Sequence, residues 1–282
     1  MMTAPASAQR ARKAIVRELE SNGFIDRIMS SGPEMDRLKT WLEIFMGRRE
    51  GPSAPGQAPV IFPPFPGLDE RPWRDASTIS VARALEQQRA AIERDLVRLE
   101  QRQFFSYDAD IVSGGEWSVH PVFFAGERVD TMFWAEQPMD ETVAVIESLE
   151  GECSKFPLAD VLYSSHAPGT KLTPHCSWDG FRMRLHLGLR VPPGCGIRVG
   201  DESREWSEGK VIVFHDSFEH ETWNNGSGRR VVLIVDCWHP GLTLPEREAL
   251  MTMTRQRGVR SKLAALRVPT AMVEQLEARF ED

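Results

Sequence analysis

The feature that most constrains the fold is a series of short, strand-like segments between residues 161 and 238. Turn-forming residues separate these segments, and no helical pattern lies between them. Many short strands without intervening helices are typical of antiparallel sandwiches and barrels such as a jelly roll, and they disfavour a doubly wound parallel sheet. We therefore predict a mainly β core from the segments VLYSSHAP, TKLTPH, FRMRLHLGLRV, GIRVG, KVIVFHD, ETW and RRVVLIVDCW.

Helical patterns flank this β region and suggest a division of the chain. Apolar residues recur every three or four positions before residue 46, so residues 1–46 are predicted to form an N-terminal helical appendage. Residues 47–59, rich in proline and glycine, are predicted to be a linker. Residues 60–250 then form the β-rich domain with its flanking helices, and residues 251–282 are predicted to be C-terminal helices.

Three local patterns refine this division. Thr78 is the predicted cap of one helix whose apolar stripe continues to Leu99. A shorter helix is expected around Glu141–Leu149, and Pro245 is expected to start the C-terminal helical region. The stretch PVIFPPFPGLDERPW contains too much proline for a central strand, so it is predicted to be an extended segment that packs across the domain.

The composition limits the classes of partner and compartment. A total of 34 Lys and Arg against 41 Asp and Glu gives a formal net charge of −7, which argues against nucleic acid or a broad anionic membrane surface as a partner. The four cysteines form no CxxC pair, so neither a disulfide framework nor a thiolate zinc site is indicated. The chain has no run of about 18 apolar residues and no apolar leader, so we expect a cytoplasmic protein without a membrane span.

Strict alternation in FRMRLHLGL separates the two faces of one predicted strand. Phe181 and Met183 begin an apolar face, whereas Arg182, Arg184 and His186 share the opposite one. On an open sheet the polar face would simply be exposed to solvent. In a closed barrel it would point inward, and arginines there would favour an anionic ligand.

Histidines gather in the same region of the chain. Six of the seven lie between His166 and His239, and the remaining one is His120. A single histidine is more often a hydrogen-bonded structural residue than a ligand, but the clustering favours a metal site. His175 ends one strand and His220 belongs to the HDSFEH turn, so a hairpin-rich β fold can bring the two together.

Several motifs in register carry a resemblance to a known family. They are YSSHAPGTKLTPH, RMRLHLGLRVP, WSEGKVIVFHDSFEHETWN and DCWHPGLT, with a weaker likeness upstream through FPGLDERPW and GEWSVHPVFF. Over residues 60–250 the chain resembles the aspartyl/asparaginyl β-hydroxylases. The resemblance implies a double-stranded β-helix (jelly-roll, cupin-like) oxygenase domain that uses Fe(II), 2-oxoglutarate and O2.

The resemblance also implies the catalytic residues. His175 and His220 would bind the iron, and Arg230 would form an ion pair with the distal carboxylate of 2-oxoglutarate. Most 2-oxoglutarate oxygenases add an Asp or Glu two residues after the first histidine, but this family lacks that ligand. Ser177 stands there in this chain, where family members usually have glycine. Two neutral imidazoles suit Fe(II), and water can take the third position.

Other residues receive supporting roles. The resemblance implies cosubstrate contacts from Ser164, Arg184 and His186. Asp179 can reach the metal only through a tight turn, so a turn or substrate contact is favoured over ligation. Asp216 is expected to orient the second histidine or its turn rather than to bind the metal.

The resemblance predicts hydroxylation at the β-carbon of an aspartyl or asparaginyl unit in a peptide, a free amino acid or an amino acid tethered to a carrier protein. Two alternatives are a fatty-acyl hydroxylase of the lipid A type and a non-catalytic cupin-like module that binds a metal or an anion. Residues 1–46 can dock a carrier or peptide leader, or serve dimerisation or packing, and no oligomeric state is indicated. Trp117, Trp134 and Trp223 are candidates for the substrate channel, although core packing is the more common role of tryptophan.

Overall fold

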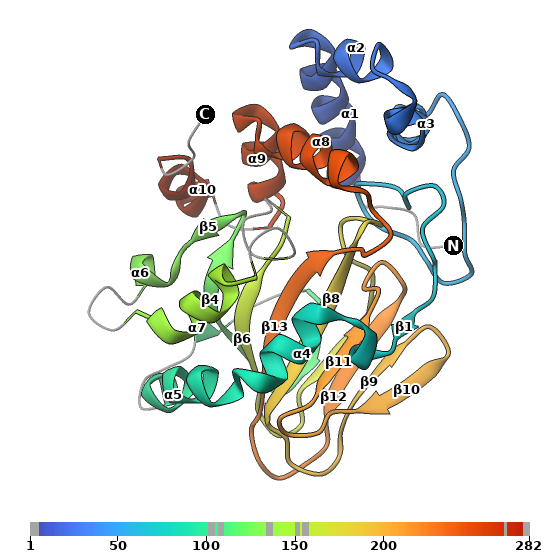
Figure 1. The fold of residues 1–282 in the computed structure, drawn as a ribbon. Helices are drawn as coiled ribbons and strands as arrows, with labels where there is room; N and C mark the ends of the chain where they lie inside the picture. Colours follow the sequence, from blue (N-terminus) through green and yellow to red (C-terminus); the bar gives the residue numbers. More distant parts are fainter. Residues whose placement is uncertain are drawn as a thin grey trace.

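Two antiparallel sheets form the body of the molecule in a computed structural model (Figure 1). The structure describes residues 6–100, 105–106, 110–133, 138–149, 153, 158–267 and 270–278. Its strands are β1 (Trp73–Arg74), β2 (Phe105–Ser106), β3 (Val112–Gly114), β4 (Trp117–Phe124), β5 (Glu127–Arg128), β6 (Val161–His166), β7 (Lys171–His175), β8 (Arg182–Arg190), β9 (Cys195–Val199), β10 (Glu202–Glu205), β11 (Val211–Phe214), β12 (His220–Asn224) and β13 (Arg230–Trp238).

The order of the strands gives the fold class. The larger sheet has the order β1-β11-β8-β13-β6-β4-β2, with β5 paired to β4, and the smaller sheet has the order β10-β9-β12-β7-β3. Neighbours such as β8 and β13 are distant in the sequence, and every pairing between these strands is antiparallel. The predicted β core with flanking helices, of the jelly-roll and cupin-like class, is confirmed.

Helices surround the sheets on the outside. They are α1 (Ala6–Ser21), α2 (Phe24–Met29), α3 (Asp36–Phe45), α4 (Ser80–Gln87), α5 (Arg89–Glu100), α6 (Asp130–Phe133), α7 (Asp140–Glu147), α8 (Leu244–Arg255), α9 (Arg257–Ala264) and α10 (Thr270–Glu277), with the 3-10 turns η1 (Pro33–Met35) and η2 (Ala76–Thr78). The short helix expected near residue 141 is α7. The expected C-terminal start is also present, because Thr243 and Glu246 form a capping box at the first turn of α8.

The single helix predicted from Thr78 to Leu99 is wrong in two respects. Thr78 ends the turn η2, which Asp75 caps by accepting a hydrogen bond from the Ser77 amide, and the following helix begins at Ser80. The apolar stripe is also divided between two helices, because α4 packs on β8 and β11 whereas α5 packs on α7. Figure 1 shows α4 lying across the larger sheet.

The larger sheet separates an apolar outer core from a more polar interior. On β8, Met183, Leu185 and Leu187 pack into one cluster with residues of α4, α5 and α7. Arg182 and His186, on the alternate positions, are also buried, and they face the smaller sheet. The alternation predicted for this strand is therefore confirmed, and its polar side points inward rather than to solvent.

The helices of the two chain ends share a second core with the proline-rich segment. Trp41 of α3 lies at its centre and stacks on Phe45 and Phe65, while Leu250 and Val259 join it from α8 and α9. Figure 1 shows α8 and α9 beside α1. The segment before β1 is thus an ordered, extended coat, as its composition predicts.

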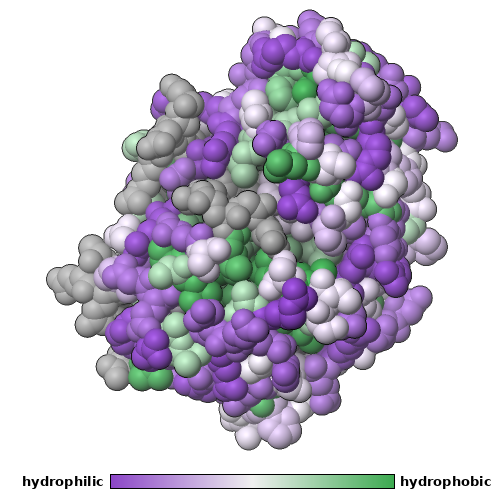
Figure 2. All heavy atoms as spheres, in the orientation of Figure 1, coloured by the Kyte–Doolittle hydropathy of each residue, from purple (hydrophilic) through white to green (hydrophobic). Residues whose placement is uncertain are grey.

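The surface is dominated by hydrophilic residues in the view of Figure 2, with hydrophobic residues showing mainly around α7.

Within the predicted linker, the amide of Ala58 donates a hydrogen bond to the carbonyl of Ser217, and the carbonyl of Gly56 accepts one from the amide of Glu219. This segment therefore lies against the turn that precedes His220. Among the helices that the structure describes, none is both long and apolar enough to cross a lipid bilayer.

Candidate metal and anion site

The two predicted metal ligands lie opposite each other in the smaller sheet. His175 ends β7, His220 begins β12, and the two are direct partners in the antiparallel ladder. Their ring centroids are 4.2 Å apart. The ring of His220 is also 5.8 Å from that of Phe214 in the larger sheet, so the pair faces the space between the two sheets. Strand pairing alone brings together these two histidines, which lie 45 positions apart in the sequence.

Backbone carbonyls fix the orientation of both imidazoles. His175 Nδ1 lies 2.7 Å from the carbonyl of Thr173, and His220 Nδ1 lies 2.9 Å from that of Phe218. A carbonyl only accepts, so each Nδ1 carries the proton and each Nε2 keeps its lone pair. Burial lowers the pKa of both histidines, which keeps them neutral near pH 7. Two neutral, oriented Nε2 atoms are a suitable donor set for a divalent transition metal.

The two aspartates that lie four residues from these histidines are engaged elsewhere. Asp179 accepts hydrogen bonds from the amides of Phe181 and Arg182 at 3.2 and 3.1 Å, and its other oxygen lies 2.8 Å from Arg182 Nε. Asp216 lies 3.2 Å from Arg182 and 3.3 Å from Arg184. Within the described ranges, no three His, Cys, Asp or Glu side chains are grouped to hold a metal ion.

Arg230 is a buried cation that has no anionic partner among the residues described by the structure. It begins β13 and is 1% exposed, and no carboxylate in the described part of the chain lies within ion-pairing distance. Its guanidinium lies 4.7 Å from the ring centroid of Trp206 and 3.5 Å from the carbonyl of Ser164, while Nε has no hydrogen-bond partner in the described ranges. Burial lowers the pKa of Arg230 to about 9, so it remains charged at neutral pH. An isolated buried charge is costly, and a bound anion would offset that cost.

Hydrogen-bond donors and aromatic rings connect Arg230 to the histidine pair. Ser164 Oγ accepts a hydrogen bond from Trp117 Nε1 at 3.1 Å, so its own hydroxyl remains a donor. His186 stacks on Trp206 with ring centroids 5.9 Å apart and meets Phe214 edge-on at 5.0 Å. Since Phe214 also contacts His220, the anion site and the histidine pair belong to one interior.

Arg184, a predicted cosubstrate contact, forms ion pairs with carboxylates of the chain. Its Nε and one terminal nitrogen each lie 2.8 Å from an oxygen of Asp236, and Asp216 and Asp160 are at 3.3 and 3.7 Å. The negative charges raise its pKa even though burial opposes this. Of the four predicted cosubstrate residues, Arg230, Ser164 and His186 are thus brought together, and Arg184 lies in an adjoining cluster of charges.

This charge cluster centres on Arg182, which contacts three carboxylates at once. Its partners are Asp179, Asp216 and Asp236, all fully buried, and Arg184 shares the last two. With Asp160, which also contacts Arg184, and its partner Arg267, four carboxylates share three guanidinium groups, so among the described residues of this cluster one negative charge is in excess. Burial and the neighbouring carboxylates raise the pKa of Asp179 to about 6, whereas the two arginines hold the pKa of Asp216 below its usual value against the effect of burial.

The raised pKa of Asp179 predicts a stability that falls with rising pH. The folded pKa of about 6 exceeds the usual 3.8, so the folded chain binds this proton more tightly, and the associated stability is lost between about pH 4 and pH 7. The linkage amounts to about 3 kcal/mol. Asp179→Asn should therefore gain stability relative to the parent chain between pH 4.5 and pH 7.5, as measured by urea unfolding. A difference between the two proteins that stays constant with pH would contradict this assignment.

The tryptophans predicted for the substrate channel have different environments. Trp117 contacts Ser164 at the anion site and lies edge-on to His166. Trp223 faces Gly196 on the neighbouring strand, where a β-carbon would collide with its indole ring, so it serves packing. Trp134 lies outside the described residues.

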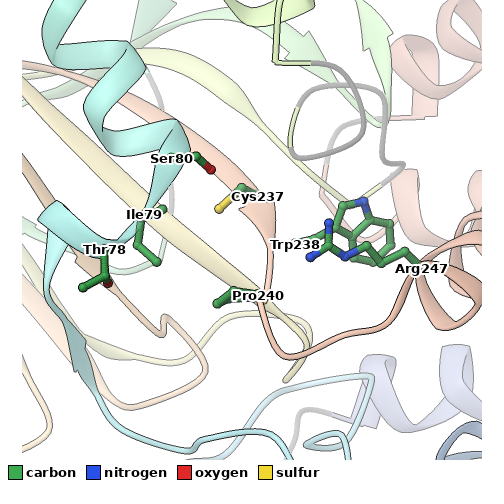
Figure 3. A pocket seen from close by; sticks show the side chains of 7 residues that line it. All are labelled: Thr78, Ile79, Ser80, Cys237, Trp238, Pro240 and Arg247. Atoms are coloured by element: carbon green, nitrogen blue, oxygen red, sulfur yellow. The ribbon is translucent and has the colours of Figure 1, made fainter.

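A small open pocket lies apart from this site, where β13 ends. Figure 3 shows residues of η2 and the start of α4 on one side and Trp238 and Arg247 on the other, and its lining is Thr78, Ile79, Ser80, Cys237, Trp238, Pro240 and Arg247. Cys237 belongs to the apolar outer core of the larger sheet. The pocket contains none of the predicted site residues, so it does not extend the candidate site.

Comparison with known proteins identifies the family. The family model described as aspartyl/asparaginyl beta-hydroxylase matches residues 86–240, more than half of the chain. The chain belongs to this family. A mouse aspartyl/asparaginyl beta-hydroxylase is 34% identical over 191 residues, which cover 65% of this chain and 25% of the relative. The rat aspartate beta-hydroxylase domain-containing protein 2 is 46% identical over 87 residues, 30% of this chain and 25% of the relative.

This member of the aspartyl/asparaginyl β-hydroxylase family therefore spans about a quarter of the length of the curated relatives it matches. Among solved structures, a predicted oxalate decarboxylase from Thermotoga maritima aligns with 48% of this chain and 94% of its own, at 11% identity and a TM-score of 0.32. The cupin domain of Schizosaccharomyces pombe Cnp3 aligns with 29% and 57%, at 10% identity and a TM-score of 0.26.

Some residues of the site have no role in the motif-based prediction. His166 and Trp206 flank Arg230, and Asp236 holds Arg182 and Arg184 of β8. Asp236 offers one usable signal, because a lone carboxylate in the apolar run VVLIVDCW needs a buried cation as partner. Trp206 lies in the connection between β10 and β11 and carries no comparable signal.

Proposed function

We propose that this chain is an Fe(II)- and 2-oxoglutarate-dependent hydroxylase that acts on the β-carbon of an aspartyl or asparaginyl unit. The observation that carries the proposal is Arg230, a buried cation with no anionic partner among the described residues, in the same interior as the oriented pair His175 and His220. A metal held by two histidines and a dicarboxylic ligand held by an arginine would satisfy both features. Membership in the β-hydroxylase family supports the choice of reaction.

The residues present fit the two groups. Nε2 of His175 and Nε2 of His220 would hold the iron, while the carbonyls of Thr173 and Phe218 keep both rings in place. Arg230 would bind the distal carboxylate of 2-oxoglutarate. When bound, iron and 2-oxoglutarate would supply the oxidation of an unactivated C–H bond by O2, with succinate and CO2 as by-products.

The chain's own contribution is to orient the ligands and to exclude water. Ser164, whose Oγ accepts from Trp117, would donate its hydroxyl to the anion, and His186 offers a ring nitrogen that has no partner within the described residues. Apolar side chains surround this polar interior from both sheets, namely Ile197, Val199, Phe214, Phe218, Val232 and Ile234. A dry interior strengthens the ion pair of Arg230 and protects a reactive oxidant from side reactions.

The decisive experiment is a turnover screen by mass spectrometry. The purified chain with Fe(II), 2-oxoglutarate and O2 is offered peptides, free amino acids and carrier-bound amino acids that contain aspartyl or asparaginyl units. Gain of one oxygen atom on such a unit, with one succinate formed per product, supports the proposal. Hydroxylation of acyl chains alone would identify the fatty-acyl alternative. Iron binding without consumption of 2-oxoglutarate across the whole panel would identify a non-catalytic module.

Arg230→Gln is expected to separate ligand binding from stability. Removing the buried cation should raise the KM for 2-oxoglutarate by at least about 30-fold, because one partner of a buried charge pair is lost. The ligand-free protein should become more stable, since an uncompensated charge is removed from the interior. KM and the urea midpoint measure the two effects.

The neighbouring Arg229→Gln is the matched control. The side chain of Arg229 is 42% exposed and bonds to Ser165 and Glu116 at the surface, so both the KM and the midpoint should stay close to those of the parent chain. Equal effects of the two substitutions, or a less stable Arg230→Gln protein with an unchanged KM, would show that Arg230 serves the fold.

A further inference from the structure

His166 is a second unsatisfied group beside Arg230. It ends β6, is 1% exposed and is the direct ladder partner of Arg230 on β13. Neither of its ring nitrogens has a hydrogen-bond partner among the residues that the structure describes. Leaving both nitrogens of a buried imidazole without a partner is unfavourable, so a bound group that satisfies one of them would be stabilised.

The position of the ring is fixed from three directions. The carbonyl of His166 accepts a hydrogen bond from the side-chain amide of Asn224 at 2.9 Å, which holds the end of the strand. Trp117 meets the imidazole edge-on, with ring centroids 6.2 Å apart. Tyr163, three positions earlier, belongs to the outer apolar core, so alternation turns Ser164 and His166 toward the interior.

The ring is a neutral donor rather than a second cation. Burial, together with the charge of Arg230 and the proximity of His186, lowers the pKa of His166 well below its usual value. A neutral imidazole has one N–H to donate. The interior around Arg230 therefore offers one positive charge and several neutral donors, which matches a single carboxylate better than a doubly charged phosphate.

We infer that His166 is a specificity-determining residue that donates a hydrogen bond to the distal carboxylate of 2-oxoglutarate, beside Arg230. This inference rests on the proposed function. Arg184 is bound by Asp236 through two nitrogens, whereas the N–H of His166, next to the proposed ion pair, has no partner among the described side chains and backbone groups. His166 thus adds a directional contact without adding charge, and it favours 2-oxo acids that end in a carboxylate over those that end in an alkyl group.

The test measures ligand binding rather than turnover. Calorimetry under anaerobic conditions gives the Kd of 2-oxoglutarate for the Fe(II)-loaded chain, and 2-oxopentanoate serves as the probe without a distal carboxylate. His166→Leu should weaken 2-oxoglutarate by at least about tenfold, the loss expected for one hydrogen bond to a charged group. The same substitution should change the Kd of 2-oxopentanoate by less than about twofold. His166→Gln, which restores an N–H, should recover most of the affinity for 2-oxoglutarate.

Tyr163→Phe is the control on the same strand. It removes hydrogen bonds to Thr142 and Ile92 in the outer core and should leave both Kd values unchanged. An unchanged 2-oxoglutarate Kd in His166→Leu, or an equal loss for both ligands, would overturn the inference while the proposed function stands. Failure of the parent chain to bind 2-oxoglutarate at all would overturn the proposed function itself. Should His166→Leu fold poorly, His166→Phe, which keeps an aromatic ring but has no N–H, takes its place, and an unchanged 2-oxoglutarate Kd in that variant would overturn the inference.

Discussion

Replacing Arg182 with methionine should lower the free energy of unfolding by about 3–5 kcal/mol, because it removes one partner of a buried ion cluster. Arg182 is 1% exposed and contacts Asp179, Asp216 and Asp236, each of which is fully buried. Without it, Arg184 alone would face the negative charges. Urea unfolding near pH 7.5 measures the change through the midpoint, and thermal unfolding provides an independent check.

The pH dependence of this deficit separates charge from packing. In Arg182→Met, loss of the buried cation should raise the folded-state pKa of Asp179 further and should remove one of the two arginines that hold the pKa of Asp216 low. Stability carried by a raised pKa is present at low pH and is lost as pH increases, so the deficit should shrink on acidification toward about pH 4.5. A deficit that is the same at both pH values would show that Arg182 acts through packed volume.

Arg190→Met is the matched control for this prediction. Arg190 lies on the same strand, but its side chain is 35% exposed and pairs with Glu93 and Glu100 near the surface. Screened pairs of this kind contribute about 0–1 kcal/mol, so the unfolding midpoint should move little. A loss as large as that of Arg182→Met would contradict the importance given to burial.

The same cluster connects the fold to the candidate metal site. Asp179 follows His175 by four residues and Asp216 precedes His220 by four, so Arg182 joins the two turns that carry the histidines. The amide of Ser177 also donates to the carbonyl of Asp216 and joins the same two turns directly. Ser177 occupies the position of the carboxylate ligand that the family lacks. It thus helps to set the spacing between His175 and His220.

The features that could be predicted from sequence are those with a local period. Alternation along β8 identifies which side chains share a face, and the succession of short strands indicates two antiparallel sheets. Motif resemblance then pairs His175 with His220 across 45 residues, and strand pairing brings the two rings together. Arg230 also follows from its motif, and its burial with no anionic partner in the described part of the chain gives that assignment physical support.

The features that could not be predicted depend on strand order. β13 lies between β8 and β6, and this order places Asp236 against Arg184 and His166 opposite Arg230. Nothing in the local pattern of any one strand encodes those neighbours. The division between α4 and α5 has the same origin, because each helix packs on a different element. Non-local packing also joins α1 and α3 to α8 and α9 around Trp41.

His220→Ala should abolish measurable turnover and weaken Fe(II) binding by more than about 100-fold, beyond the 10–100-fold typical for loss of a residue that only orients a ligand. The expectation is strong because only two protein ligands are proposed, so a single substitution removes half of them. Fe(II) affinity measured anaerobically by calorimetry tests it without reference to substrate. His175→Ala should behave alike, and the double variant should add little, since residues that act as a unit are not additive.

His215→Asn distinguishes loss of a ligand from disturbance of the turn. His215 is buried five residues before His220, and its Nδ1 bonds to Ser217 Oγ at 2.8 Å, so replacing it perturbs the same turn and leaves the histidine pair intact. Its Fe(II) affinity should stay within a few-fold of the parent chain. If His215→Asn lost the metal as fully as His220→Ala, the turn would be the sensitive element, and if His220→Ala kept full turnover, the two-histidine site would be refuted. The prediction is therefore specific to the imidazole that faces His175.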